Sequence, residues 1–167
     1  EQYSHEAETE LLRRCGDSLS LYAEVLSFTR LCSRVEDELG RPEGTLLDKG
    51  GRLLCMALAV DAVGSRLKIY GAARRQPPLQ SRLLSAINEL KAACVTPERL
   101  GAFAAACSPT LAEKLGELTL IYEAYEAVLA QGRLDPTDRL TRLAGNIGHS
   151  AFARGRFYLD GFTDFTY

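Results

Sequence analysis

The chain has 167 residues, of which 46% are hydrophobic and 25% are charged, and its formal net charge is −2 at neutral pH. These proportions are ordinary for a globular protein, and a chain of this length can bury a core without metals or disulfides. The weak negative charge argues against a free-standing DNA-binding domain, although it leaves room for a local basic strip. The sequence therefore predicts one domain, or one domain with a piece of another.

The five cysteines show neither a zinc spacing nor a disulfide framework, because no two lie within four residues of each other and their number is odd. We expect free, buried thiols in a reducing cytoplasm. The N-terminus is polar and acidic, unlike a signal peptide. The longest apolar stretch, residues 53–63, is too short to cross a bilayer and contains Asp61. No metal site and no membrane span are predicted.

In the first part of the chain, a helix is predicted over residues 4–14 and a short strand over residues 22–26, where apolar and polar residues alternate. Ser27 can cap a second helix over residues 28–39, which Gly40 would end. The sequence here therefore predicts a helix, a strand and a second helix.

The middle of the chain is predicted to be helical throughout. Asp48 opens a helix whose apolar residues cover nearly the whole circumference, so we expect it to be central and buried. The breaker at residues 76–78 precedes an amphipathic helix. A capping oxygen followed by proline then marks three more helix starts, near residues 97, 109 and 136. Tyr122 and Tyr125 belong to an apolar seam, which favours a role in core packing over a role as a platform for stacking bases.

An apolar run that ends in an acid lies near the C-terminus, and residues 156–160 are predicted to form a buried strand. P-loop NTPases place the carboxylate that holds nucleotide-bound Mg²⁺ at the end of such a strand. Residues 157–166 resemble the superfamily-1 helicase segment Asp-Glu-Phe-Gln-Asp-Thr with its preceding apolar run. Asp160 and Asp164 match its two aspartates, but Gly161 stands where that family has the glutamate that orients attacking water. The Asp-Gly pair is also an ordinary turn signal.

Two other stretches carry the same resemblance. Residues 1–8, Glu-Gln-Tyr-Ser-His-Glu-Ala-Glu, resemble the DNA-contacting corner of helicase motif Ia. Residues 26–32, Leu-Ser-Phe-Thr-Arg-Leu-Cys, resemble the Thr-Phe-His-x-Leu-Ala segment of UvrD-like helicases. Together with Ile-Asn-Glu-Leu-Lys at residues 87–91, these motifs most resemble the sequences of AddB, also called RexB, the B-subunit family of bacterial AddAB helicase–nucleases.

The resemblance implies a mainly α fold: a helical 1B-like bundle with one or two short strands from a partial RecA-like α/β core. It assigns residues 1–39 to a RecA-like 1A segment, residues 40–152 to the helical 1B-like insertion, and residues 153–167 to a return strand with a degenerate Walker B motif. The predicted strands at residues 22–26 and 156–160 are then expected to lie side by side and parallel.

The resemblance also implies double-strand-break processing in the bacterial cytoplasm, with an AddA-type motor subunit and DNA as partners and no membrane. The region itself is expected to be non-catalytic and to hold no cofactor or metal, since it has no phosphate-binding loop. A longer parent is expected, because Glu1 is not an initiator methionine and Tyr167 follows a strand-like run. Any site for ATP and Mg²⁺ would need a loop before Glu1, and an iron–sulfur cluster would lie far beyond Tyr167.

Candidate DNA-contacting residues come from the helicase-like corner and from the densest basic patch: Gln2, His5, Thr29, Arg30, Lys68, Arg74 and Arg75. The competing interpretations are a solvated surface for His5 and an ordinary cationic helix end for the basic patch.

Two other functions remain open on the sequence. One is an α-helical protein-interaction module without a nucleic-acid role. The other is a fragment of an active UvrD-like helicase, against which Gly161 argues. A parallel pair of the two predicted strands favours the helicase hypothesis, whereas a closed bundle with Asp160 in a loose tail favours the module.

Overall fold

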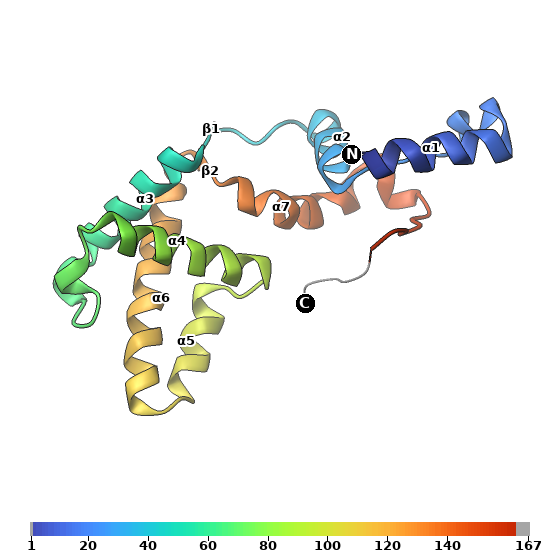
Figure 1. The fold of residues 1–167 in the computed structure, drawn as a ribbon. Coiled ribbons are helices and arrows are strands. Elements are labelled where there is room, and N and C mark those ends of the chain that lie inside the picture. Colours follow the sequence, from blue (N-terminus) through green and yellow to red (C-terminus); the bar gives the residue numbers. More distant parts are fainter. Residues whose placement is uncertain (1, 163–167) are drawn as a thin grey trace. The chain divides into compact units, whose positions relative to one another are not determined.

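The structure is a computed structural model that describes residues 2–162, apart from the side chain of Gln2 (Figure 1). Within this range it contains seven α-helices and two strands of two residues each, which confirms the predicted mainly α fold. The chain divides into two compact units. Unit 1 comprises Glu1–Pro42 and Arg139–Phe157, and unit 2 comprises Glu43–Asp138 and Tyr158–Tyr167. No helix in the described range is long and apolar enough to cross a membrane.

Unit 1 contains helices α1 (Gln2–Cys15), α2 (Phe28–Leu39) and α7 (Arg139–Asn146), together with short 3₁₀ turns. The bounds of α2 are those predicted: the Ser27 side chain accepts a hydrogen bond from the Arg30 N–H at 3.3 Å, and the helix ends at Gly40. The core of the unit lies between α2 and α7 and consists of Leu31, Cys32, Val35 and Leu143.

The strand predicted at residues 22–26 is absent, so that prediction was wrong. A 3₁₀ turn over Asp17–Leu21 comes first, and the chain then runs without regular structure to the start of α2. Tyr22, expected on an alternating strand, is 86% exposed. Alternation predicts a strand only where a neighbouring strand can accept its hydrogen bonds, and the described part of the chain provides none beside this segment.

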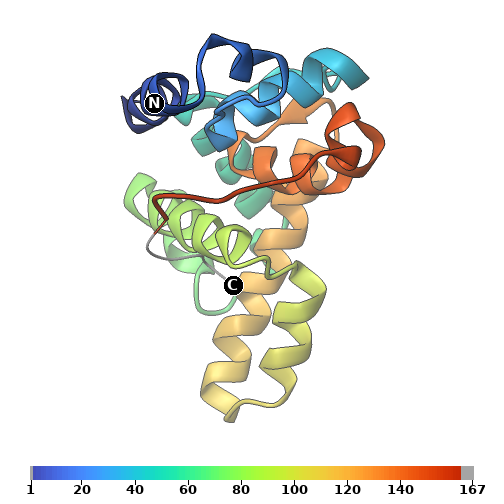
Figure 2. The same ribbon diagram turned by 90° about the vertical axis from the view of Figure 1, so that its right-hand side faces the viewer.

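Unit 2 is built on helices α3 (Lys49–Ala62), α4 (Pro77–Ala92), α5 (Pro97–Ala105) and α6 (Pro109–Leu129). The long helix α6 packs against both α3 and α5, and α4 packs against α3. Figure 2 shows α5 running alongside the lower part of α6. The predicted helix starts at residues 48, 97 and 109 are confirmed, whereas α4 begins at Pro77, within the residues predicted as a breaker, because proline is tolerated in the first turn of a helix.

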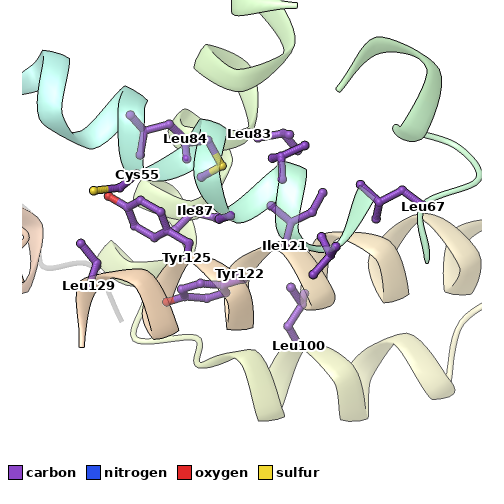
Figure 3. Close-up of a cluster of buried hydrophobic side chains, with 14 residues drawn as sticks. Cys55, Leu67, Leu83, Leu84, Ile87, Leu100, Ile121, Tyr122, Tyr125 and Leu129 are labelled. Carbon is purple, nitrogen blue, oxygen red and sulfur yellow. The ribbon is translucent and has the colours of Figure 1, made fainter. Parts of the chain in front are cut away.

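The core of unit 2 lies where α3, α4 and α6 meet, and Figure 3 shows its side chains converging from these helices and from α5. Tyr122 and Tyr125 point into it, which confirms that the tyrosine seam is core packing. Helix α3 is buried on one side only, because Leu54 is 63% exposed and Leu58 49% exposed. The predicted burial around its whole circumference was therefore wrong: α4 and α6 cover only one face.

The third proline-marked start gives a 3₁₀ turn, Pro136–Asp138, that leads into α7. The Asp135 side chain still acts as a cap, since its Oδ1 accepts the Thr137 N–H at 2.9 Å. The two observed strands, β1 (Thr45–Leu46) and β2 (Arg133–Leu134), pair in parallel within unit 2 at positions that the sequence did not predict.

Residues 156–160 also form no strand, which corrects the second strand prediction and with it the expected parallel pair. The apolar side chains of this segment are exposed rather than buried, with Tyr158 at 84%. The helicase-domain assignments of residues 1–39, 40–152 and 153–167 stay predictions. All five cysteines are free, as expected, but only two of them, Cys32 and Cys55, are buried.

Candidate nucleic-acid interface

The candidates from the helicase-like corner lie in unit 1. His5 is exposed on α1, and Thr29 and Arg30 are exposed in the first turn of α2. The side chain of Gln2 lies outside the described residues. The structure assigns these residues to a different unit from Lys68, Arg74 and Arg75, so the seven candidates divide into two groups.

The Walker-B-like segment is an exposed, irregular stretch around Asp160, and Asp164 lies outside the described residues. Gly161 has a φ of 77°, in the left-handed region that glycine adopts readily and other residues rarely. This backbone conformation by itself favours a glycine at position 161, independently of the helicase resemblance, in which Gly161 replaces a glutamate. Among the described residues, no group of three or more His, Cys, Asp or Glu side chains is placed to hold a metal ion.

The second group lies on the connection between α3 and α4, residues 63–76, which we call the basic loop. From residue 62 to residue 88 the sequence holds five basic residues and no acidic one, within a chain of negative net charge. Lys68 and Arg75 expose 82% and 80% of their side chains. A local positive surface of this kind is what phosphate binding requires.

A buried carboxylate on α6 holds the basic loop in shape. Glu117, 6% exposed, accepts the N–H groups of three consecutive loop residues. The Lys68 N–H lies 2.6 Å from Oε1, the Ile69 N–H 2.9 Å from Oε1, and the Tyr70 N–H 3.0 Å from Oε2. Burial alone would raise the pKa of Glu117, but these three donors outweigh it, so its pKa lies below the ordinary value.

Glu117 was not among the predicted site residues. It lies four residues before Ile121 and eight before Tyr125, both fully buried, so it shares the inward face of α6. A charged residue on a buried helical face is a signal that the sequence did contain. The sequence did not reveal that its partners are backbone groups of a distant loop.

Arg74 and Arg75 converge on one carboxylate, that of Asp61 at the end of α3. The Nε atoms of both arginines lie 3.8 Å from its Oδ1. Arg74 also donates from Nη1 to the Gly71 carbonyl at 3.3 Å. The two arginines and the carboxylate border an open pocket of about 280 Å³, lined by Ala57, Leu58, Asp61, Arg74, Arg75 and Gln80. The sequence had predicted the two arginines but not the pocket.

A second group, of charged and polar residues in unit 2, which we call the Asp135 cluster, comprises Arg52, Asn88, Lys91, Tyr125, Asp135, Thr137 and Asp138. Asp135 has a fully buried side chain; Arg52 Nε lies 3.1 Å from its Oδ1, and Lys91 Nζ lies 3.7 Å from its Oδ2. The Tyr125 hydroxyl donates to Asp135 Oδ2 at 2.9 Å. Lys91 also donates to both oxygens of Asp138 at 2.8 Å, and Arg52 donates to Asn88 and Thr137.

The Asp135 cluster ties α3, α4 and α6 to the 135–138 turn. Burial opposes the ionisation of Asp135, but the Thr137 N–H, Lys91, Tyr125 and Arg52 outweigh it and lower the pKa of its carboxyl. The protein itself already supplies hydrogen-bond partners for Asp135, and its side chain is out of reach of solvent. The cluster is therefore part of the interior, and the basic loop is the better candidate for a binding site.

Comparison with known protein families identifies the family of this chain. The sequence model of the family described as "ADDB, N-terminal" matches residues 1–167. The chain therefore belongs to the AddB N-terminal family, as the resemblance at its two ends predicted.

Several curated relatives match 99% of the chain. The B subunit of the ATP-dependent helicase/deoxyribonuclease of Thermoanaerobacter sp. (strain X514) is 36% identical over 168 residues, which cover 99% of this chain and 15% of the relative. The protein of the same name from Moorella thermoacetica is 35% identical over 173 residues, covering 99% and 15%. The one from Caldanaerobacter subterraneus is 34% identical over 177 residues, covering 99% and 14%. The chain thus spans about 15% of the length of these relatives.

Proposed function

We propose that this chain is the N-terminal region of the B subunit of an ATP-dependent helicase/deoxyribonuclease that processes DNA double-strand breaks for recombinational repair in the bacterial cytoplasm. The observation that carries the proposal is the family match along all 167 residues, together with the shared name of the relatives. The region contributes a helicase-like scaffold and DNA contacts, and no catalysis. Its partners are DNA and an AddA-type motor subunit.

The scaffold role has support in two segments that were predicted as strands. Tyr22 in one, and Tyr158 and Leu159 in the other, are more than half exposed. Large apolar side chains gathered on an irregular segment favour burial against further protein. Each segment therefore suits burial against a part of the subunit outside this region.

The DNA-contact role has support in the basic loop, since Lys68, Arg74 and Arg75 are held on the surface of a chain with negative net charge. Gly161 supports a region that does not hydrolyse ATP, because it offers no carboxylate to orient water. Any ATP, Mg²⁺ or iron–sulfur cluster of the whole subunit would be bound by residues outside this region.

The test uses the full-length subunit that carries this region. It is purified with its motor partner and given linear duplex DNA, ATP and Mg²⁺, and unwinding and degradation are followed on a gel. We expect a stable complex that degrades the DNA, and much less processing when the subunit is omitted. Closed circular DNA is the control and should survive, since it has no ends. Equal processing without the subunit, or no complex with the motor partner, contradicts the proposal.

A further inference from the structure

We infer that the pocket between Arg74, Arg75 and Asp61 binds a phosphodiester group of DNA, and that Asp61 acts as an internal competitor for the two guanidinium groups. The inference rests on the proposed function and deepens it, because it names the group that the basic loop binds and the residue that limits its affinity.

The convergence of the two arginines is the first argument. Two adjacent side chains in a sequence are free to diverge, yet both Nε atoms lie 3.8 Å from the same oxygen of Asp61. The Nε of Arg74 is buried and has no hydrogen-bond acceptor. Guanidinium groups bind phosphate oxygens through paired N–H donors, so two that face one point form a site for a tetrahedral anion.

The weakness of the existing ion pairs is the second argument. A separation of 3.8 Å is too long for a hydrogen bond, and 62% of the Asp61 side chain and 80% of the Arg75 side chain are exposed. Exposed pairs of this kind contribute little to stability. The carboxylate is therefore a poor partner, which a phosphate with more acceptor oxygens can displace.

The placement of Arg74 is the third argument. A Cβ atom on Gly64 would lie 2.8 Å from Arg74 Cδ, so the arginine stem passes close over Gly64 and would have to shift if this residue had a side chain. The Gly71 carbonyl accepts from its Nη1, and Gln80 Nε2 donates to its backbone carbonyl at 3.0 Å. A guanidinium that is already oriented loses less conformational entropy when it binds a ligand.

The rest of the pocket suits the part of a nucleotide that surrounds its phosphate. Ala57 and Leu58 supply an apolar wall, and Leu58 is 49% exposed in the free protein. Gln80 supplies a neutral amide. Apolar contact with sugar or base, beside charged contact with phosphate, is typical of proteins that bind the nucleic-acid backbone without reading its sequence.

The experiment measures the affinity of the full-length subunit for fluorescent single-stranded and duplex oligonucleotides by anisotropy, at two or more salt concentrations. We expect R74A/R75A to weaken binding by about tenfold and to reduce the slope of log affinity against log salt by about 1. D61N should strengthen binding by about threefold, because the competing charge is removed. G64A should weaken binding although no charge changes, since it displaces Arg74.

Matched controls come from Asp37 and Arg41, an exposed ion pair on unit 1 with 55% and 77% of the side chains exposed. D37N makes the same charge change as D61N, and R41A removes one of the two positive charges that R74A/R75A removes; both controls should leave binding within about twofold. Comparing the two oligonucleotides shows whether the pocket takes its phosphate from single strands or from duplex DNA.

Unchanged binding in R74A/R75A, or D61N that binds no better than D37N, overturns the inference. In either case the proposed function stands if the complex still processes DNA ends. If the wild-type protein binds neither oligonucleotide, the inference also fails. The proposed function is judged separately, because its failure would appear as unchanged processing of linear DNA when the subunit is omitted. Should G64A fail to fold, the exposed sites at Asp61 and Arg75 still decide the question.

Discussion

The Asp135 cluster and the basic loop both gather charged side chains within unit 2, but the centre of the first is buried, whereas Lys68 and Arg75 in the second are largely exposed to water. Asp135 is fully buried and has Arg52, Lys91, Tyr125 and the Thr137 N–H as partners. In the basic loop, by contrast, the shortest ion-pair distance of Lys68 is 3.5 Å and that of Arg75 is 3.8 Å, both to exposed carboxylates. In the first arrangement the charged groups are neutralised by one another, whereas in the second the positive charges of Lys68 and Arg75 remain available to a ligand.

The difference shows how burial divides charged residues between stability and binding. A buried charge that loses its partner is left uncompensated in a poorly polarisable interior, so each member of the Asp135 cluster is needed by the others. An exposed charge is solvated with or without a partner, so its removal changes affinity for a ligand far more than stability. Glu117 joins the two cases, because it is a buried carboxylate that shapes the exposed loop.

The largest effect is expected for Asp135→Ala, which leaves Lys91 and Arg52 buried without their shared partner. We expect a loss of about 3–5 kcal/mol in the free energy of unfolding, measured by urea denaturation. Asp61→Ala is the matched control, because it removes an exposed aspartate from the same unit and should change stability by less than about 0.5 kcal/mol. Similar losses in the two variants would remove the distinction between the regions.

Glu117→Gln should have the next largest effect. The amide can still accept some of the N–H groups of Lys68, Ile69 and Tyr70 but lacks the charge, so we expect a loss of about 1–3 kcal/mol. Hydrogen exchange of these three N–H groups should quicken, and DNA affinity should fall although no loop residue has changed. Glu113→Gln, which loses only an exposed pair with Lys68, should leave the exchange rates as they are.

Acid should weaken unit 2 through the same two buried carboxyls. The pKa values of Asp135 and Glu117 are lower in the folded protein than their ordinary values of about 3.9 and 4.3. Their ionisation therefore stabilises the fold fully above those ordinary values, and this contribution is lost as the pH falls below them. The midpoint of thermal unfolding, measured from pH 7 to pH 3, should drop below about pH 4. A smaller drop is expected in Glu117→Gln, and an unchanged drop would contradict this assignment.

Lys68→Ala should separate binding from stability at a single position. Because 82% of the side chain is exposed, we expect a change in unfolding free energy within about 0.5 kcal/mol. If Lys68 contacts a phosphate, DNA affinity should fall severalfold and the salt slope should decrease by about 1. Arg41→Ala is the control, with similar exposure on unit 1.

The smallest effect is expected for Gly161→Glu, which restores the residue that the helicase resemblance lacks. We expect no ATP hydrolysis by the chain before or after the change, in an assay of released phosphate. The sequence has no phosphate-binding loop, and the φ of 77° at this position does not suit glutamate. Turnover in either protein would contradict the interpretation of this segment.

Helix boundaries followed from the sequence because capping is local chemistry. Ser27, Asp48 and Thr96 each accept the N–H three residues ahead, as their position before a helical pattern predicts. The strands did not follow, because a strand exists only with a neighbour. Residues 22–26 and 156–160 have strand-like composition without a strand beside them in the described structure, whereas β1 and β2 are only two residues each.

The candidate site was predicted in part. The sequence alone predicted Lys68, Arg74 and Arg75 as a basic patch, and its short motifs predicted the family. Both predictions depend on residues that are near each other in the sequence. Only the tertiary structure placed Asp61 between the two arginines, Glu117 beneath the loop and Asp135 in the interior. These contacts join residues 13 to 83 positions apart. Burial and the convergence of charges depend on how helices pack, and that is decided by the fold as a whole.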